Sequence, residues 1–150
     1  MKPLSVCLLL AATAFLASCS SSNKPTASAP RPTSGRTISL EGTEWVLTDL
    51  AGTLALPGGK ATLVFPEAGR VAGNGSCNRF TGALTITGDA LKIGPLASTR
   101  MACVDESVSK QEDAYLKALG GATRYSYQDP DLLIYCEGFD KPLRFVRATP

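Results

Sequence analysis

The stretch Gly73-Asn74-Gly75-Ser76-Cys77-Asn78-Arg79-Phe80-Thr81-Gly82 carries the most information about how this chain folds. Its glycines suit tight backbone bends at the end of a strand, and the Asn78 amide can satisfy backbone groups of a loop. We expect a loop-stabilising role for Asn78, Arg79 and Phe80, with a binding role as the alternative. Gly73-x-Gly75 lacks the third glycine and the long following helix of a dinucleotide-binding turn, so a nucleotide site is not predicted.

Short β-prone segments separated by turn residues surround this stretch. One segment, residues 107–119, shows helical spacing, with a Ser109-x-x-Glu112 capping box near its start and Gly120-Gly121 after its end. The sequence predicts an α+β, mostly β fold, in which an antiparallel curved sheet or half-open barrel of about seven or eight short strands packs with that one helix. The expected strands are residues 43–50, 61–65, 70–73, 83–87, 90–93 and 97–102, then three alternating segments around 125–127, 132–136 and 143–145.

The N-terminus has the layout of a secretory signal: a basic start, an apolar run and small residues before Cys19. Leu16-Ala17-Ser18-Cys19 resembles a bacterial lipobox, in which the cysteine receives a diacylglycerol. We therefore expect a signal peptide at 1–18, a lipidated Cys19 with a Ser, Pro, Ala and Thr-rich tether at 19–37, and a folded domain at 38–150. The alternatives are an ordinary signal peptidase site and a retained membrane anchor.

The lipid on Cys19 would place the protein in the cell envelope with the membrane as a partner. Ser20, rather than Asp, follows that cysteine, and this favours the outer membrane, facing the periplasm. The mature chain would carry 14 basic and 13 acidic residues once Lys2 is removed, without a basic cluster, so nucleic acid is not an expected partner. The chain contains no histidine, which removes the commonest general base and metal ligand, and no cofactor is expected besides the lipid.

Two motifs in order give the chain a family resemblance. The glycine-rich stretch is followed by Leu96-Ala97-Ser98-Thr99-Arg100-Met101-Ala102-Cys103, and together they resemble the META domain of HslJ-like proteins over about residues 40–147. An early Gly42-Thr43-x-Trp45 segment and a late Leu143-x-Phe145 segment agree in order. The resemblance assigns motif positions to Gly75, Cys77, Asn78, Arg79, Phe80, Gly82, Thr99 and Met101.

This resemblance implies a compact, mostly β domain that is often lipid-anchored or secreted in bacteria. Family members are associated with heat-shock expression, with novobiocin resistance and, in some organisms, with virulence or motility. The family brings no catalytic activity and no ligand, so it informs the fold more than the function.

Three cysteines would remain in an oxidising compartment after Cys19 is lipidated. Because Cys77 and Cys103 lie in the two family-like motifs, we expect them to form a disulfide, while Cys136 alternates with apolar residues and should lie in the core. A bridge across about 26 residues would stabilise the fold by roughly 3–4 kcal/mol in the chain-entropy model. The alternative is a reactive Cys77 thiol beside Arg79, which has neither a histidine nor a Cys-x-x-Cys pair to support it.

Other side chains could serve a site or only the core. Trp45, Phe80, Tyr125 and Tyr127 could line a ligand cavity, although aromatic residues on strands more often pack as core. The acidic residues Asp105, Glu106, Glu112 and Asp113 are expected to form a solvated first helical turn that complements the helix dipole.

The sequence favours a non-enzymatic envelope lipoprotein that acts in stress tolerance by binding a hydrophobic ligand or an envelope protein. A pilotin-like docking or assembly module for an outer-membrane complex is the first alternative, and a thiol-dependent enzyme is the second. We name no catalytic residues and no metal ligands, and the sequence leaves the oligomeric state open.

Overall fold

A computed structural model describes residues 37–57 and 60–149 of the chain. These residues belong to one compact unit, Thr33–Pro150. The predicted signal peptide, Cys19 and all of the predicted tether except Thr37 lie outside the described residues. Within the described part of the chain, no helix is long and apolar enough to cross a membrane.

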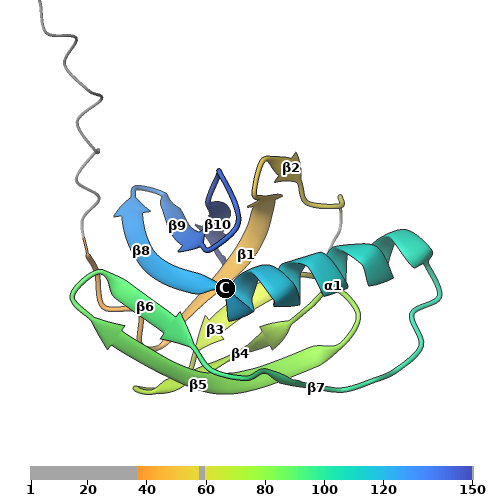
Figure 1. Ribbon diagram of the computed structural model, residues 1–150, viewed down its shortest axis with the longest axis horizontal. Helices are drawn as coiled ribbons and strands as arrows, with labels where there is room; N and C mark the ends of the chain where they lie inside the picture. Colours follow the sequence, from red (N-terminus) through yellow and green to blue (C-terminus); the bar gives the residue numbers. More distant parts are fainter. Residues whose placement is uncertain (1–36, 58–59, 150) are drawn as a thin grey trace, which may run out of the picture. The chain divides into compact units, whose positions relative to one another are not determined.

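The described residues form ten strands and one helix (Figure 1). The single helix, α1 (Glu106–Gly120), comes between the seventh and eighth strands. The strands are β1 (Thr43–Leu50), β2 (Thr53–Leu54), β3 (Thr62–Phe65), β4 (Arg70–Asn74), β5 (Arg79–Thr87), β6 (Ala90–Ile93), β7 (Ala97–Ser98), β8 (Ala122–Gln128), β9 (Asp131–Cys136) and β10 (Leu143–Arg147).

Eight of these strands close into an antiparallel barrel. The order β10-β9-β8-β6-β5-β4-β3-β1 returns to its start because β1 also pairs with β10, with Trp45 opposite Arg147 and Leu47 opposite Phe145. The two-residue strands β2 and β7 are added outside the ring, on β1 and β5. Closure leaves few exposed strand edges, which explains how many short strands can form one stable unit.

Alternating side chains fill the barrel. On β1, Thr43, Trp45 and Leu47 are buried, whereas Glu44 is exposed, as the two-residue period of a strand requires. Trp45 is fully buried, and its indole N–H donates to the Thr43 hydroxyl at 2.7 Å. The helix completes the core with Tyr115, which lies 6.0 Å from Phe80 between ring centroids.

The prediction of a mostly β fold with one helix is confirmed. The barrel is closed by the pairing of β1 with β10, whereas a curved sheet or half-open barrel was predicted. Strand β1 and strand β6 have their predicted bounds, and α1 extends one residue beyond the predicted 107–119 at each end. The largest differences from the prediction are in β5 and β7, and β2 was not predicted. β5 begins at Arg79, so six of the ten residues 73–82 lie in β4 or β5, and only Ala97–Ser98 of the expected strand 97–102 is paired.

The predicted capping box at the start of the helix is wrong. The helix begins earlier, at an Asp105 N-cap whose carboxylate accepts from the Ser107 hydroxyl at 2.7 Å and from the Ser107 N–H at 2.8 Å. The hydroxyl bond first, and then the N–H bond, lowers the pKa of Asp105. Ser109 therefore lies inside the first turns. Glu112 is also not part of a solvated turn, because only 7% of its surface is exposed. Its partners lie in the glycine-rich stretch.

Candidate functional site

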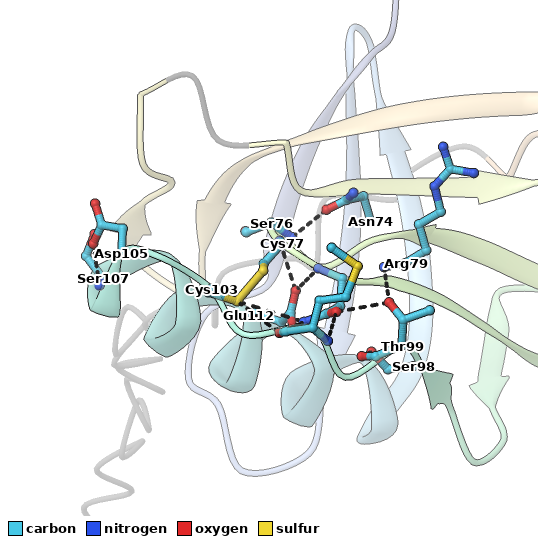
Figure 2. Close-up of a disulfide and its surroundings, with 12 residues drawn as sticks. Asn74, Ser76, Cys77, Arg79, Ser98, Thr99, Cys103, Asp105, Ser107 and Glu112 are labelled. Atoms are coloured by element: carbon cyan, nitrogen blue, oxygen red, sulfur yellow. Dashed lines mark hydrogen bonds between the residues drawn. A yellow bond between two sulfur atoms is a disulfide. The ribbon is translucent and has the colours of Figure 1, made fainter.

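The predicted disulfide joins the two family-like motifs. Cys77 and Cys103 are bonded, with their Cα atoms 6.0 Å apart (Figure 2). The remaining described cysteine, Cys136, is buried in the core, and burial raises the pKa of its thiol to about 12. A thiolate at Cys77 would require the bridge to open, and Cys136 stays a neutral thiol near pH 7.

Beside the disulfide, the buried Glu112 carboxylate binds the motif loop directly. Its Oε2 accepts from the backbone N–H of Cys77 at 2.9 Å and of Asn78 at 2.6 Å, and its Oε1 accepts from the Asn78 side-chain amide at 2.7 Å (Figure 2). We call Cys77, Asn78 and Glu112 the Glu112 clamp. Three donors satisfy this carboxylate away from water, as a buried charge requires.

Asn78 extends the clamp to the second motif. Its side-chain oxygen accepts from the Met101 N–H at 2.8 Å and from the Thr99 hydroxyl at 3.0 Å. Its amide nitrogen also lies 3.2 Å from the Met101 carbonyl oxygen. The Asn78 side chain thus holds three segments together: its own loop, the segment after β7, and the helix through Glu112.

Gln111 and Asn74, which the sequence analysis did not single out, support the same loop through hydrogen bonds to Ser76. Ser76 has φ of +126°, a backbone conformation that non-glycine residues rarely adopt. The Gln111 amide donates to the Ser76 hydroxyl at 2.7 Å, and the Asn74 side chain accepts from the Ser76 N–H at 2.9 Å. These bonds offset the unfavourable backbone conformation. A glutamine inside a helical pattern gives no signal of such a partner 35 residues away.

The remaining motif positions have structural or surface roles. Gly82 is needed for close packing, because an added Cβ would lie 2.7 Å from Leu96 Cδ2. Arg79 is exposed, and its side chain points away from the Glu112 clamp (Figure 2). Met101 contributes its backbone to Asn78 while its side chain is 69% exposed. Phe80 is buried in the core.

The Glu112 clamp is a structural arrangement rather than a reactive one. Its carboxylate already accepts three hydrogen bonds, two from backbone N–H groups and one from the Asn78 side-chain amide, and the neighbouring sulfur is part of a disulfide. No group of three or more metal-ligating side chains occurs within residues 37–57 and 60–149. The clamp therefore fixes α1 against the turn between β4 and β5.

A cavity of about 300 Å³ lies at the other end of the barrel. We call it the Tyr125 cavity, and its main apolar lining consists of Ile38, Leu40, Phe65, Leu84, Ile86 and Tyr125. Leu84 follows Asn78 by six positions along the β5 segment, a distance of about 20 Å in a strand. The clamp and the cavity therefore occupy opposite ends of β5.

Of the four aromatic residues predicted as ligand-lining, one borders this cavity. The Tyr125 hydroxyl donates to the Ile38 carbonyl oxygen at 3.0 Å, and burial, then the nearby Asp89 charge, raises the pKa of Tyr125. Trp45 and Phe80 lie in the core cluster, and Tyr127 packs edge-on against Trp45 at 6.1 Å between ring centroids. Ile38, Leu84 and Ile86 line the cavity without having been predicted, since residues so far apart in the chain meet only in the folded barrel.

Comparisons with known proteins agree with this architecture. The family model of the META domain matches residues 38–150. The chain is similar to an NMR structure of a protein from Burkholderia xenovorans, with 26% identity, 81% of this chain and all of that chain covered, and a TM-score of 0.61. A second NMR structure has 22% identity, 69% and 87% coverage, and a TM-score of 0.56, which supports the fold alone. Comparison with curated proteins finds no match.

The clamp predicts that Gly75 tolerates no side chain. A Cβ at this position would lie 2.7 Å from both Cγ and Oε2 of Glu112, which three hydrogen bonds hold in place. Gly75→Ala should lower the free energy of unfolding in urea by about 1–3 kcal/mol. Gly120→Ala is the matched control, because nothing lies within 4 Å of its added Cβ, and it should be neutral or stabilising. Equal stability of the two variants would contradict the clamp.

Proposed function

The chain belongs to the META-domain family, and from this premise we propose that it is a non-enzymatic lipoprotein of the bacterial envelope that binds a hydrophobic small molecule. The observation that carries the proposal is the Tyr125 cavity. Its wall combines six large apolar side chains with the polar side chains of Ser39, Glu41 and Glu67, so a ligand would find both apolar contact and polar groups there. Its volume of about 300 Å³ suits a small ligand rather than a large one.

The rest of the domain supports a preformed site. Three strands of the closed barrel, β3, β5 and β8, supply Phe65, Leu84, Ile86 and Tyr125, and the rest of the lining comes from residues 38–41 before β1 and from the turn at residues 67–69. The other end of β5 is held by the Glu112 clamp and the disulfide. A rigid scaffold lowers the entropy that is lost when a ligand binds, and that favours binding without a large conformational change.

Two features support the absence of catalysis. The Cys77 sulfur is bonded to Cys103, and the Cys136 thiol is buried with a raised pKa of about 12. The chain also has no histidine to act as a base near neutral pH. We propose that the protein contributes to envelope stress tolerance, and the support for this is the family's association with heat shock and novobiocin resistance.

The proposed location rests on the lipobox-like sequence ending at Cys19 and on the Ser20 that follows it. Cys19→Ala should block lipidation and release the mature protein into the soluble periplasmic fraction, or leave it unprocessed with its signal attached. Fractionation with an antibody to the domain measures this. A Cys19→Ala protein that is processed normally and still sediments with the outer membrane would exclude a lipid anchor at this residue.

The cavity predicts saturable binding of an uncharged apolar probe. The mature chain from Ser20 onward, secreted without the lipidation cysteine, should increase the fluorescence of 1-N-phenylnaphthylamine at a single site. Ile86 lines the cavity and is 39% exposed, so Ile86→Trp should fill the space without unfolding the barrel and should remove most of the binding. Leu54→Trp, at an 81% exposed position on β2, is the control and should bind like the wild type. Binding that Ile86→Trp leaves unchanged would refute the cavity as the site.

A further inference from the structure

The Tyr125 cavity has an asymmetric charge distribution. Two carboxylates, Glu41 and Glu67, belong to its lining, and no Lys or Arg does. The backbone N–H of Tyr125 donates to the Asp89 carbonyl oxygen at 2.9 Å, which places a third acidic residue close by. The apolar wall is therefore bordered by negative charge.

The neighbouring cations offset only part of this charge. Arg70 pairs with Glu67 at 3.1 Å, and because both side chains are more than half exposed the pair is weak; Arg70 itself is not part of the cavity lining. Arg124 precedes Tyr125 on β8 and so points to the opposite face of the sheet. Its guanidinium stacks on the Tyr135 ring, 3.4 Å from the ring centroid.

Polar atoms at the cavity can accept hydrogen bonds from a charged head group. The Tyr125 hydroxyl donates its proton to the Ile38 carbonyl oxygen, so toward any further partner its oxygen is an acceptor only. The Glu41 and Glu67 carboxylates are acceptors as well. An ammonium group only donates, whereas a carboxylate ligand would meet acceptors and like charge.

We propose that the Tyr125 cavity selects apolar molecules that carry one positive charge, such as alkylamine-type amphiphiles, over neutral and anionic molecules of the same size. This inference rests on the proposed function, since it assigns a ligand class to the same cavity. The apolar tail would lie against Leu84, Phe65 and Ile86, and the ammonium group would lie at the rim beside Glu41 and Glu67.

Three probes with one tail separate charge from apolar contact: octylamine, octanol and octanoate, each competing with 1-N-phenylnaphthylamine on the mature chain near pH 7. We expect octylamine to bind most tightly and octanoate least, with a preference of up to about fivefold for each exposed carboxylate that contributes. The difference between amine and carboxylate should shrink at about 1 M salt, where the Debye length falls to about 3 Å.

A charge-removing variant tests the residues themselves. Glu41→Gln with Glu67→Gln should bring octylamine down to the affinity of octanol while leaving octanol unchanged. Glu106→Gln with Glu137→Gln removes two exposed carboxylates outside the cavity lining and should keep the wild-type order. Equal binding of octylamine and octanoate by the wild type, or an order that survives the cavity substitutions, would overturn the inference while leaving the proposed function standing.

Two further results would contradict the inference in other ways. If none of the probes and no phenylnaphthylamine binds, both the inference and the proposed function fail. Arg36 and Arg31 lie shortly before Ile38 in the sequence, so Arg31→Gln with Arg36→Gln is made as well. We expect this variant to bind octylamine like the wild type. A severalfold gain in octylamine affinity would show that these arginines compete with octylamine for the cavity. That result would overturn the proposal that a small amphiphile is its occupant.

Discussion

The buried Glu112 carboxylate is the constraint on which the arrangement of this domain depends. It comes from the middle of the only described helix and accepts from two backbone N–H groups of the motif loop. A carboxylate without such donors would be costly to bury, and a loop with unsatisfied N–H groups would be costly too. Each therefore requires the other, and together they fix the helix at one end of the barrel. The disulfide then limits the freedom of the same loop in the unfolded chain.

This constraint divides the barrel into two regions with different properties. At the clamp end, the polar groups form hydrogen bonds with one another. The glycine at position 75 lets the Glu112 carboxylate approach the backbone. At the other end, apolar side chains and two glutamates line a partly open cavity of about 300 Å³ between segments far apart in the sequence. This division supports the proposed small-molecule site, because a tightly held end of the barrel would keep the cavity at the other end in shape.

The sequence predicts the local elements well and the long-range polar contacts poorly. Alternation on Thr43–Leu50 and the 3.6-residue spacing before Gly120 are local patterns, so β1 and α1 could be placed almost to the residue. The spacing of Ser109 and Glu112 also fitted a capping box, but the glutamate bonds to a loop 34 and 35 residues earlier. No pattern within one helix shows that a side chain has a distant partner. The cavity could not be predicted from the sequence for the same reason, because its lining residues are spread along the chain from Ile38 to Tyr125.

A double-mutant cycle between Asn78 and Glu112 tests the central claim most directly. Unfolding in urea is measured for the wild type, Asn78→Ala, Glu112→Ala and the double variant. The buried, charge-assisted bond of 2.7 Å predicts a coupling free energy of about 1.5–3 kcal/mol, so that the double variant loses clearly less stability than the two single losses added together. Single losses that add to within about 0.5 kcal/mol would show that the Asn78 and Glu112 side chains do not stabilise each other, and this would contradict the account.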